Sequence, residues 1–265
     1  MKKFGLFLLV ILLPGSPATA HIINIPADQP SVQAGIDVAG YGDTVLVAEG
    51  TYFENISFKG KAITVASHFI IDGDTSHISR TIINGSRPVN VDYAPTVQMT
   101  SGEDTTSVLS GLCITGGTGT VVRYDDIFHR CGGGVYIEQC GGKIEHNLIM
   151  HNHINYDRCT VTGGGIYARV GAEYNLVIRR NTIKENTVQS RRQADAAGVL
   201  VADAFRANIF VEYNRITSNR AISTKANHAH GGGMTLAVGL SSNSDFIVRR
   251  NVISYNELKI NPELE

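Results

Sequence analysis

The chain repeats one short motif four times at a nearly constant interval. Asn-x-Ile-x-x-Asn occurs at residues 147–152, 181–186, 214–219 and 251–256. The first asparagines are 34, 33 and 37 residues apart (181−147, 214−181 and 251−214). Such a period predicts a solenoid in which each repeat forms one stacked coil. The predicted structural ladder at the coil corners consists of Asn147, Asn152, Asn181, Asn186, Asn214, Asn219, Asn251 and Asn256.

Asparagine suits a corner between two strands for two reasons. It tolerates left-handed backbone dihedrals better than most residues other than glycine, and stacked side-chain amides can bond to one another. Gly111-x-Cys113-x-x-Gly116 has the same spacing, so we predict an earlier coil with glycine at both corners. In that alignment Cys113 takes the buried position of Ile149.

The repeat also predicts which side chains point inward. Each coil begins with a small-residue run, at 132–134, 163–165, 196–198 and 231–233, and a short alternating strand follows. Aligned on the first asparagine, two columns are apolar and are expected to form the core. These columns are Ile144, Ile178, Val211 and Val248, and Ile149, Ile183, Ile216 and Ile253. A third column alternates in sign and predicts a surface ion-pair ladder of Glu145, Arg179, Glu212 and Arg249.

The first 20 residues have the pattern of a secretory signal peptide. Two lysines precede an apolar run at 4–13, and Ala18-Thr19-Ala20 is a small-x-small cleavage site. We therefore expect cleavage after Ala20 and a mature domain of residues 21–265 that is extracellular, on the cell surface or periplasmic. Residues 31–39 predict a short helix with Ser31 as N-cap, placed to cover the open end of a solenoid. Segment 66–80 is polar and predicts a loop, and no cap is visible after residue 256, so the domain can extend beyond Glu265.

Composition excludes several partners and cofactors. The formal net charge of −1 gives no basic field for nucleic acid, and residues 21–265 contain no apolar stretch that could span a membrane. No cysteine or histidine spacing predicts a metal site. Cys131 and Cys159 flank equivalent loop ends and can pair across coils, but the sequence leaves the pairing of Cys131, Cys140 and Cys159 open.

Residues 31–37, 42–47, 50–56 and 111–117, together with the asparagine coils, carry a family resemblance. The chain resembles the right-handed parallel β-helix proteins of the pectin-lyase-like superfamily over essentially all of residues 21–265. The resemblance implies an all-β fold, a single-stranded right-handed parallel β-helix with a short N-terminal capping helix. That family includes lyases, hydrolases, esterases, epimerases and adhesins. The catalytic motifs of polygalacturonases, pectin methylesterases and alginate epimerases are absent here, so no activity is carried over.

In such folds, ligand grooves lie beside the first strand of each coil, walled by the long closing loops. Here Tyr136 and Glu138, then Tyr167 and Arg169, are the outward residues of two neighbouring first strands. The two tyrosines are expected to stack on sugar faces. The predicted substrate-binding residues are Tyr136, Tyr167, Asp125, His129, Arg130, Asp157 and Arg158.

Three functions fit this pattern. The first is a secreted, carbohydrate-associated protein that binds polysaccharide on the first-strand face. The second is a lyase or hydrolase of acidic polysaccharide with Asp126, Glu138 and Arg169 as catalytic residues, and Ca²⁺ held by Asp125, Asp126 and Glu138 as a possible cofactor. The third is a structural or adhesin-like surface solenoid. The sequence leaves catalysis, the substrate and the oligomeric state open.

Overall fold

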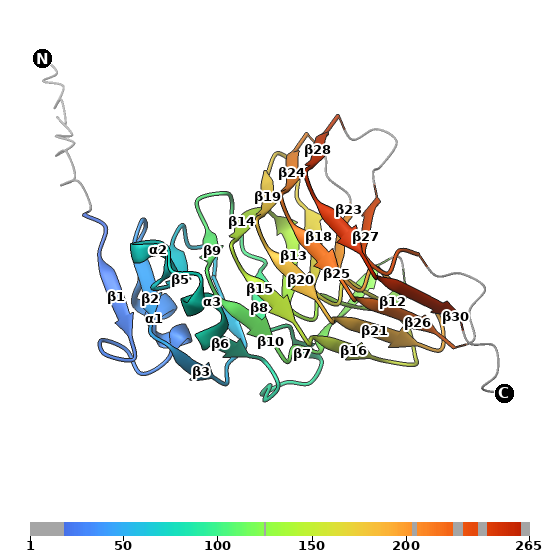
Figure 1. The fold of residues 1–265 in the computed structure, drawn as a ribbon, viewed down its shortest axis with the longest axis horizontal. Coiled ribbons are helices and arrows are strands. Elements are labelled where there is room, and N and C mark those ends of the chain that lie inside the picture. Colours follow the sequence, from blue (N-terminus) through green and yellow to red (C-terminus); the bar gives the residue numbers. More distant parts are fainter. Residues whose placement is uncertain (1–18, 125, 203–205, 225–229, 238–242, 261–265) are drawn as a thin grey trace, which may run out of the picture.

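The computed structural model describes residues 19–124, 126–202, 206–224, 230–237 and 243–260. Short strands stack coil on coil along the long axis of the molecule (Figure 1). They form a parallel β-helix, as the repeat predicts. All strand pairs in it are parallel except those that β11 makes with β12 and β7. Among the described residues, no helix is long and apolar enough to cross a membrane.

Five sheets, named A to E, make up the sides of the solenoid. Sheet A consists of β1 (Ile22–Ile25), β2 (Thr44–Val47), β5 (Thr64–Ser67), β9 (Val108–Ser110), β14 (Gly142–Glu145), β19 (Leu176–Arg179), β24 (Asn208–Glu212) and β28 (Asp245–Arg249). Sheet B consists of β3 (Gly50–Tyr52), β6 (Thr81–Asn84), β10 (Cys113–Thr115), β15 (Leu148–Met150), β20 (Thr182–Lys184), β25 (Arg215–Thr217) and β29 (Val252–Ser254). Sheet C consists of β4 (Ile56–Ser57), β8 (Val97–Met99), β13 (Val135–Cys140), β18 (Ile166–Val170), β23 (Val199–Ala202) and β27 (Met234–Ala237).

The two smaller sheets close the coils. Sheet D consists of β7 (Tyr93–Ala94), β11 (Gly119–Tyr124), β12 (Ile127–Cys131), β17 (Thr160–Thr162) and β22 (Ala194–Asp195). Sheet E consists of β16 (His153–Asn155), β21 (Thr187–Ser190), β26 (Arg220–Ser223) and β30 (Glu257–Ile260). The strands after each small-residue run, β13, β18, β23 and β27, are the predicted first strands of the coils.

Helix α1 (Val32–Val38) confirms the predicted N-terminal cap. The Ser31 hydroxyl accepts a hydrogen bond from the Ala34 amide at 3.1 Å. The Glu54 carboxylate accepts from the first two helical amides at 2.9 Å each. Ile36 on the inner side is fully buried. The helix therefore covers the first coil. Its first amides are satisfied in part by Glu54, which lies in a later connection and cannot be identified as a partner from the helix sequence.

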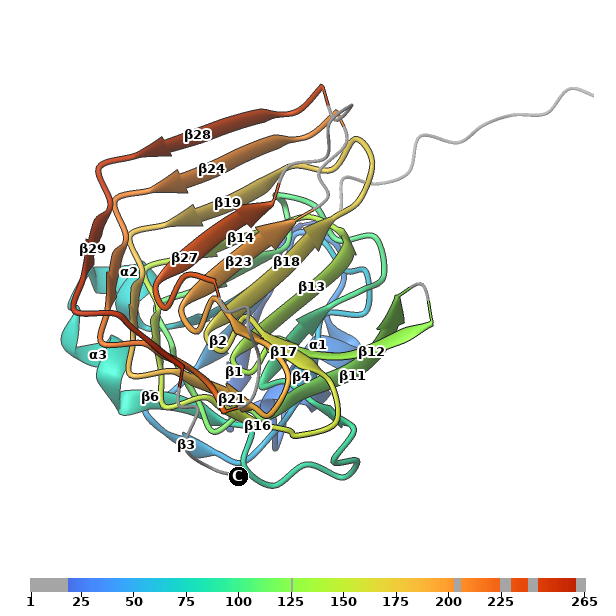
Figure 2. The same cartoon turned by 90° about the vertical axis from the view of Figure 1, so that its right-hand side faces the viewer.

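Two short helices occupy the segment predicted as a loop. Helices α2 (Phe69–Asp72) and α3 (Ser76–Arg80) follow β5 and lie against the corner between sheets A and B (Figure 2). His77 contacts Asp72 at 3.0 Å and Glu49 at 2.6 Å, which ties the helices to each other and to the first coils. The loop prediction is wrong because helices of four and five residues are too short to show helical periodicity.

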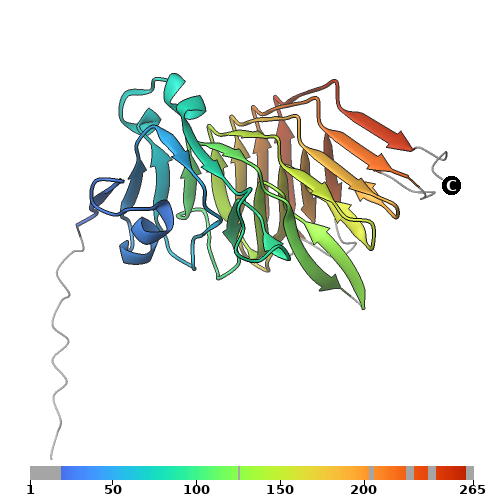
Figure 3. The ribbon, with the colours of Figure 1, turned by 90° about the horizontal axis from the view of Figure 1, so that it is seen from below.

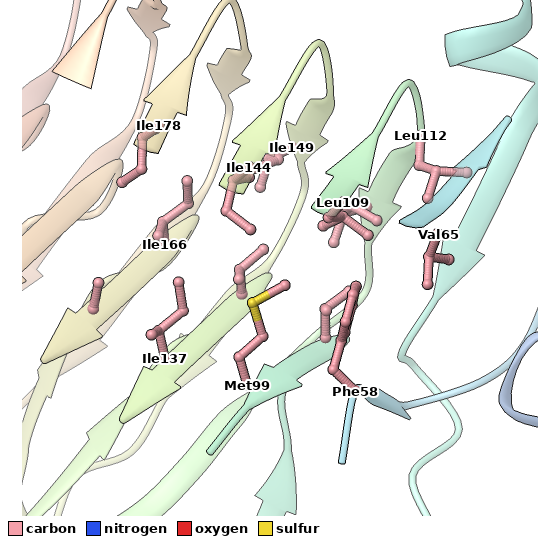
Figure 4. Packing of buried hydrophobic residues seen from close by; sticks show 14 of the residues in the cluster. Phe58, Val65, Met99, Leu109, Leu112, Ile137, Ile144, Ile149, Ile166 and Ile178 are labelled. Carbon is pink, nitrogen blue, oxygen red and sulfur yellow. The ribbon is translucent and has the colours of Figure 1, made fainter. Parts of the chain in front are cut away.

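The inward columns form the core. Every predicted inward residue from the coils at 142–150, 176–184 and 208–217 is fully buried. Side chains from facing sheets point toward one another between the strands (Figure 4). In the last described coil, Val248 and Ile253 are 40% and 46% exposed because β28 and β29 have a neighbour on one side only.

The first glycine coil is offset by one residue from the predicted alignment. Cys113 pairs with Leu148, and Ile114 takes the position of Ile149. Gly111, with φ of +69°, is therefore equivalent to His146, with φ of +58°. Cys113 is buried as expected, but in a different position. The slip arises because glycine replaces the left-handed residue before each asparagine and not the asparagine itself.

Each asparagine acts through its side chain. The Asn181 Oδ1 accepts from the Asn147 amide at 2.9 Å and from Asn147 Nδ2 at 3.2 Å. Its Nδ2 donates to the Ile144 carbonyl at 2.8 Å and to Asn214 Oδ1 at 3.1 Å. The left-handed corner conformation belongs to the preceding residue, such as Arg180 with φ of +54°. Side-chain hydrogen bonds thus link these asparagines from coil to coil, as one of the two predicted reasons required. The other reason, tolerance of left-handed dihedrals, applies to the residue before each asparagine.

The outward charged column forms separate pairs. Arg179 Nε contacts Glu145 Oε2 at 2.6 Å, and Arg249 pairs with Glu212. No ion pair between Arg179 and Glu212 occurs, although the two are register neighbours. The charge alternation thus produces two pairs with partly exposed side chains, whose contribution to stability is small.

All four cysteines are free and buried. The pairing that the sequence left open is therefore not formed. Burial raises the pKa of Cys113 and Cys159 to about 11 and that of Cys140 to about 12. The thiol is the stable form at neutral pH, and thiols react poorly.

Removal of one ladder asparagine will destabilise the fold strongly. Asn181→Ala leaves the buried Asn147 amide without an acceptor, and we expect a loss of on the order of 2–4 kcal/mol in unfolding free energy. Asn155→Ala, at an exposed position of β16, is the control and will change it by less than about 0.5 kcal/mol. Urea unfolding measures both. Equal effects in the two variants would contradict the ladder.

Thiol counting tests the cysteine assignment. We expect no cysteine to react with a thiol reagent at neutral pH in the folded protein, because all four are buried and protonated. After unfolding without reductant, four thiols will be counted. A count of two would indicate a disulfide instead.

Candidate functional site

Strands β11 and β12 form an antiparallel hairpin that projects from the coil stack (Figures 2 and 3). Alternate residues of a strand point to opposite faces, so the hairpin has two sides. Val122 and Tyr124 face sheet C, whereas Val121 and Phe128 face away from it. These two sides separate the residues that the sequence placed in a single site.

The two predicted sugar-stacking tyrosines lie beneath the hairpin. Tyr136 and Tyr167 stack on each other with ring centroids 5.6 Å apart, and they are only 2% and 4% exposed. They pack with Cys131 and Val122 of the hairpin. Their burial contradicts the expected open stacking surface, because the closing loop folds back as a hairpin over the first strands.

Glu138 holds the hairpin in place. Its carboxylate accepts hydrogen bonds from Tyr124 Oη at 2.5 Å and Tyr136 Oη at 3.0 Å, and Arg169 Nη1 lies 3.3 Å away. The Arg169 guanidinium also lies 4.7 Å from the Tyr124 ring centroid, and Tyr167 Oη donates to Tyr124 Oη. Burial and the bond to Glu138 raise the pKa of Tyr124. Two of the predicted catalytic residues, Glu138 and Arg169, thus clamp one hairpin residue.

The third predicted catalytic residue lies at the hairpin tip. Asp126 has φ of +66° and an 87% exposed side chain that contacts Arg123 at 2.5 Å. Asp125 lies outside the described residues. Asp126 and Glu138 are therefore each held by a different partner. In the described part of the chain, no three acidic, histidine or cysteine side chains form a metal-binding group. The Ca²⁺ site, which includes Asp125, stays a prediction.

Most of the remaining predicted residues have structural partners. The His129 ring lies 5.4 Å from that of Tyr124, and burial lowers its pKa. Asp157 contacts Arg191 at 3.6 Å. Arg130 is 8% exposed and donates to the carbonyls of Thr118 and Val91. Arg158 lines a cavity.

That cavity, named here the aromatic cleft, lies on the outer side of the hairpin and has a volume of about 470 Å³. Its lining residues are Asp92, Tyr93, Val121, Phe128, Tyr156 and Arg158. Tyr93 and Phe128 are 52% and 55% exposed, so two aromatic rings are open to solvent. Asp92 and Arg158 are exposed and form no side-chain hydrogen bond or ion pair with other described residues.

Separate strands position the rings of the cleft. Tyr93 of β7 pairs with Thr120 of β11, and Phe128 of β12 pairs with Arg123. The Arg130 guanidinium lies over the ring of Tyr156, 5.1 Å from its centroid, and packs against it. Arg130, predicted to bind substrate, therefore fixes a wall of the cleft instead.

Sequence reasoning missed five of the six lining residues. Besides Val121, these are the four polar or aromatic residues Asp92, Tyr93, Phe128 and Tyr156. They come from three connections of different coils, none of which belongs to the repeat. The only sequence signal is the coincidence of an aromatic residue with charged neighbours in each connection, as in Asp92-Tyr93 and Tyr156-Asp157-Arg158.

A family model described as a right-handed β-helix region matches residues 29–189, which is 161 of 265 residues (189−29+1). The chain belongs to this right-handed β-helix family. The match and the parallel solenoid confirm the predicted right-handed parallel β-helix. The matched segment extends from just before α1 into β21, and it includes the hairpin and the aromatic cleft. Searches of curated proteins and of solved structures found no significant match.

Loss of the Tyr124 hydroxyl will loosen the hairpin of this β-helix protein. Tyr124→Phe removes the 2.5 Å donor to the part-buried Glu138, and we expect a cost of about 1–3 kcal/mol in urea unfolding. Arg123→Gln changes the neighbouring residue on the solvent side of the same strand and will cost less than about 0.5 kcal/mol. A neutral Tyr124→Phe would mean that Glu138 does not anchor the hairpin.

Proposed function

We propose that this protein is a saccharide-binding β-helix protein that holds a sugar ring in the aromatic cleft. The observation that carries the proposal is the pair of half-exposed rings, Tyr93 and Phe128, at the wall of a cavity of about 470 Å³. Exposed apolar side chains that gather beside a cavity mark an interaction site, whereas singly scattered ones do not. A sugar ring offers apolar C–H faces for such rings and hydroxyls at its edge.

The polar residues of the cleft fit the edge of a sugar. Asp92 accepts hydrogen bonds and Arg158 donates them in a planar fork, and neither is engaged by another described side chain. Together they can bind hydroxyls whose positions differ around the ring. This combination of an apolar wall and a few polar groups is typical of small-ligand sites.

The cleft supports binding better than catalysis. Hydrolysis by the usual route needs two carboxylates that flank the scissile bond. Asp92 is the one carboxylate among the described lining residues. Glu138 and Arg169, the predicted catalytic residues, lie on the opposite side of the hairpin and bind Tyr124. With the predicted signal peptide at 1–20, we propose binding outside the cytoplasm.

The proposal is tested with the mature protein on a glycan array and by calorimetry with the best oligosaccharide. We expect Tyr93→Ala and Phe128→Ala each to weaken binding about tenfold or more, because each removes one stacking face, equal to about 1.4 kcal/mol. Tyr41→Ala removes a 77% exposed ring outside the cleft and will not change the affinity.

Two outcomes would contradict the proposal. One is a complete lack of glycan binding by a correctly folded protein. The other is binding that both cleft variants retain at full affinity, which would place the saccharide elsewhere on the solenoid.

A further inference from the structure

A second concave site lies on the opposite side of the coil stack from the hairpin. Residues of the α3 segment and of the corner between sheets A and B line an open cavity of about 210 Å³, named here the corner pocket. Figure 2 shows α2 and α3 against this corner and the hairpin on the far side of the stack. Thr75, His146, Arg180 and Thr182 are among its lining residues. The pocket is therefore independent of the aromatic cleft.

The helical insertion creates this pocket. The Phe69 ring of α2 packs on the His146 ring with centroids 4.9 Å apart. The absence of a side chain at Gly111 permits this contact, because a Cβ there would lie 2.9 Å from Phe69 Cδ1. The later corners carry no such helices in the described part of the chain. The pocket is thus a specific addition to the repeat and not a gap that every corner has.

Two basic residues face the pocket from adjacent coils. His146 and Arg180 each precede a ladder asparagine, and both have left-handed backbone conformations, with φ of +58° and +54°. That conformation places successive corner residues in one column along the axis. Pairing of the neighbouring asparagines fixes the spacing of the column.

The Arg180 guanidinium has no acidic partner. Among the described residues it forms no ion pair, and it lies over the Tyr213 ring, 5.9 Å from the ring centroid. The nearest acidic neighbour of His146, Glu145, is already bound to Arg179 at 2.6 Å. An exposed cation in a cavity with no bound carboxylate leaves a net positive potential there.

Both burial and neighbouring charges act on the His146 ring. Burial is the largest cause and lowers its pKa; Glu145 raises the pKa, and the charges of Arg180 and Arg179 lower it. The hydroxyls of Thr75 and Thr182 add hydrogen-bond donors that no other described group uses. The pocket is therefore lined by one guanidinium, one imidazole and three hydroxyls, of which that of Ser79 already donates to the Ser76 carbonyl.

We propose that the corner pocket binds a small oxyanion, a carboxylate or sulfate group, with Arg180 as the principal contact. The planar guanidinium donates two parallel hydrogen bonds to such a group. His146 and the hydroxyls of Thr75 and Thr182 complete its coordination. The volume suits one substituent or a single acidic sugar, so the site adds an anionic ligand class to a protein whose aromatic cleft is built for stacking.

The site is tested by NMR titration of ¹⁵N-labelled protein with sodium sulfate, with sodium chloride balancing the ionic strength. We expect saturable shifts at His146 and Thr182 and none at Phe128 in the cleft. Arg180→Gln will weaken binding about tenfold to a hundredfold, as expected for a charge-assisted bond. The matched control, Arg215→Gln, removes an exposed arginine of sheet B outside the pocket and will leave the affinity unchanged.

Further titrations identify the source of the anion. Glucuronate supplies a carboxylate and glucose supplies none, so glucuronate will shift the same resonances and glucose will not. If Arg180→Gln fails to fold, Thr182→Val provides the second test, with a smaller loss of affinity expected. Absence of saturable sulfate shifts, an equal loss in Arg180→Gln and Arg215→Gln, or binding of glucose at the same resonances would each overturn the proposal. None of these results depends on the aromatic cleft.

Discussion

Hydrogen bonding at the coil corners is the constraint on which the rest of the structure depends. At each corner the chain leaves one sheet and enters the next, so buried amides lose their strand partners. The asparagine side chain supplies an acceptor to the coil before it and a donor to a carbonyl of that same coil, as Asn181 does for Asn147 and Ile144. From Asn147 on, each coil thus supplies hydrogen-bond partners to corner backbone groups of the coil before it. These bonds fix the register between neighbouring coils at the corner, while the connections vary in length, as the spacings of 34, 33 and 37 residues show.

A scaffold fixed in this way concentrates functional variation in the few segments that depart from the repeat. The coil period leaves the connections free, and two of them carry additional structure: the β11–β12 hairpin and the helices α2 and α3. Each creates a cavity against the regular coils. Such an addition needs its own interactions with the coils. For the hairpin these are the contacts among Glu138, Tyr124 and Arg169, which hold it against sheet C.

The parts of the fold that were predictable are those that repeat. The period and the inward columns followed from the spacing of the Asn-x-Ile-x-x-Asn repeat. The capping helix followed from the pattern of residues 31–39, with Ser31 as its N-cap. The register error at Gly111 arose because one glycine cannot show which of two adjacent corner residues it replaces. Tyr136 and Tyr167 were assigned correctly to the outer face of their strands, but their burial depends on a hairpin whose folding back is a long-range event. The cleft residues Tyr93, Phe128 and Tyr156 meet for the same reason, and no local pattern unites them.

The burial of the tyrosine pair has a consequence for the cleft. Tyr136 and Tyr167 fill the space beneath the hairpin, so the inner side of the hairpin packs against buried side chains and is shielded from solvent. Arg130 adds a second support by bonding two carbonyls and carrying the Tyr156 ring. The rings that face solvent are therefore held before any ligand arrives, which lowers the entropy lost on binding. The two tyrosines that the sequence assigned to sugar stacking thus lie one layer below the surface that we propose to bind a sugar, and they support it.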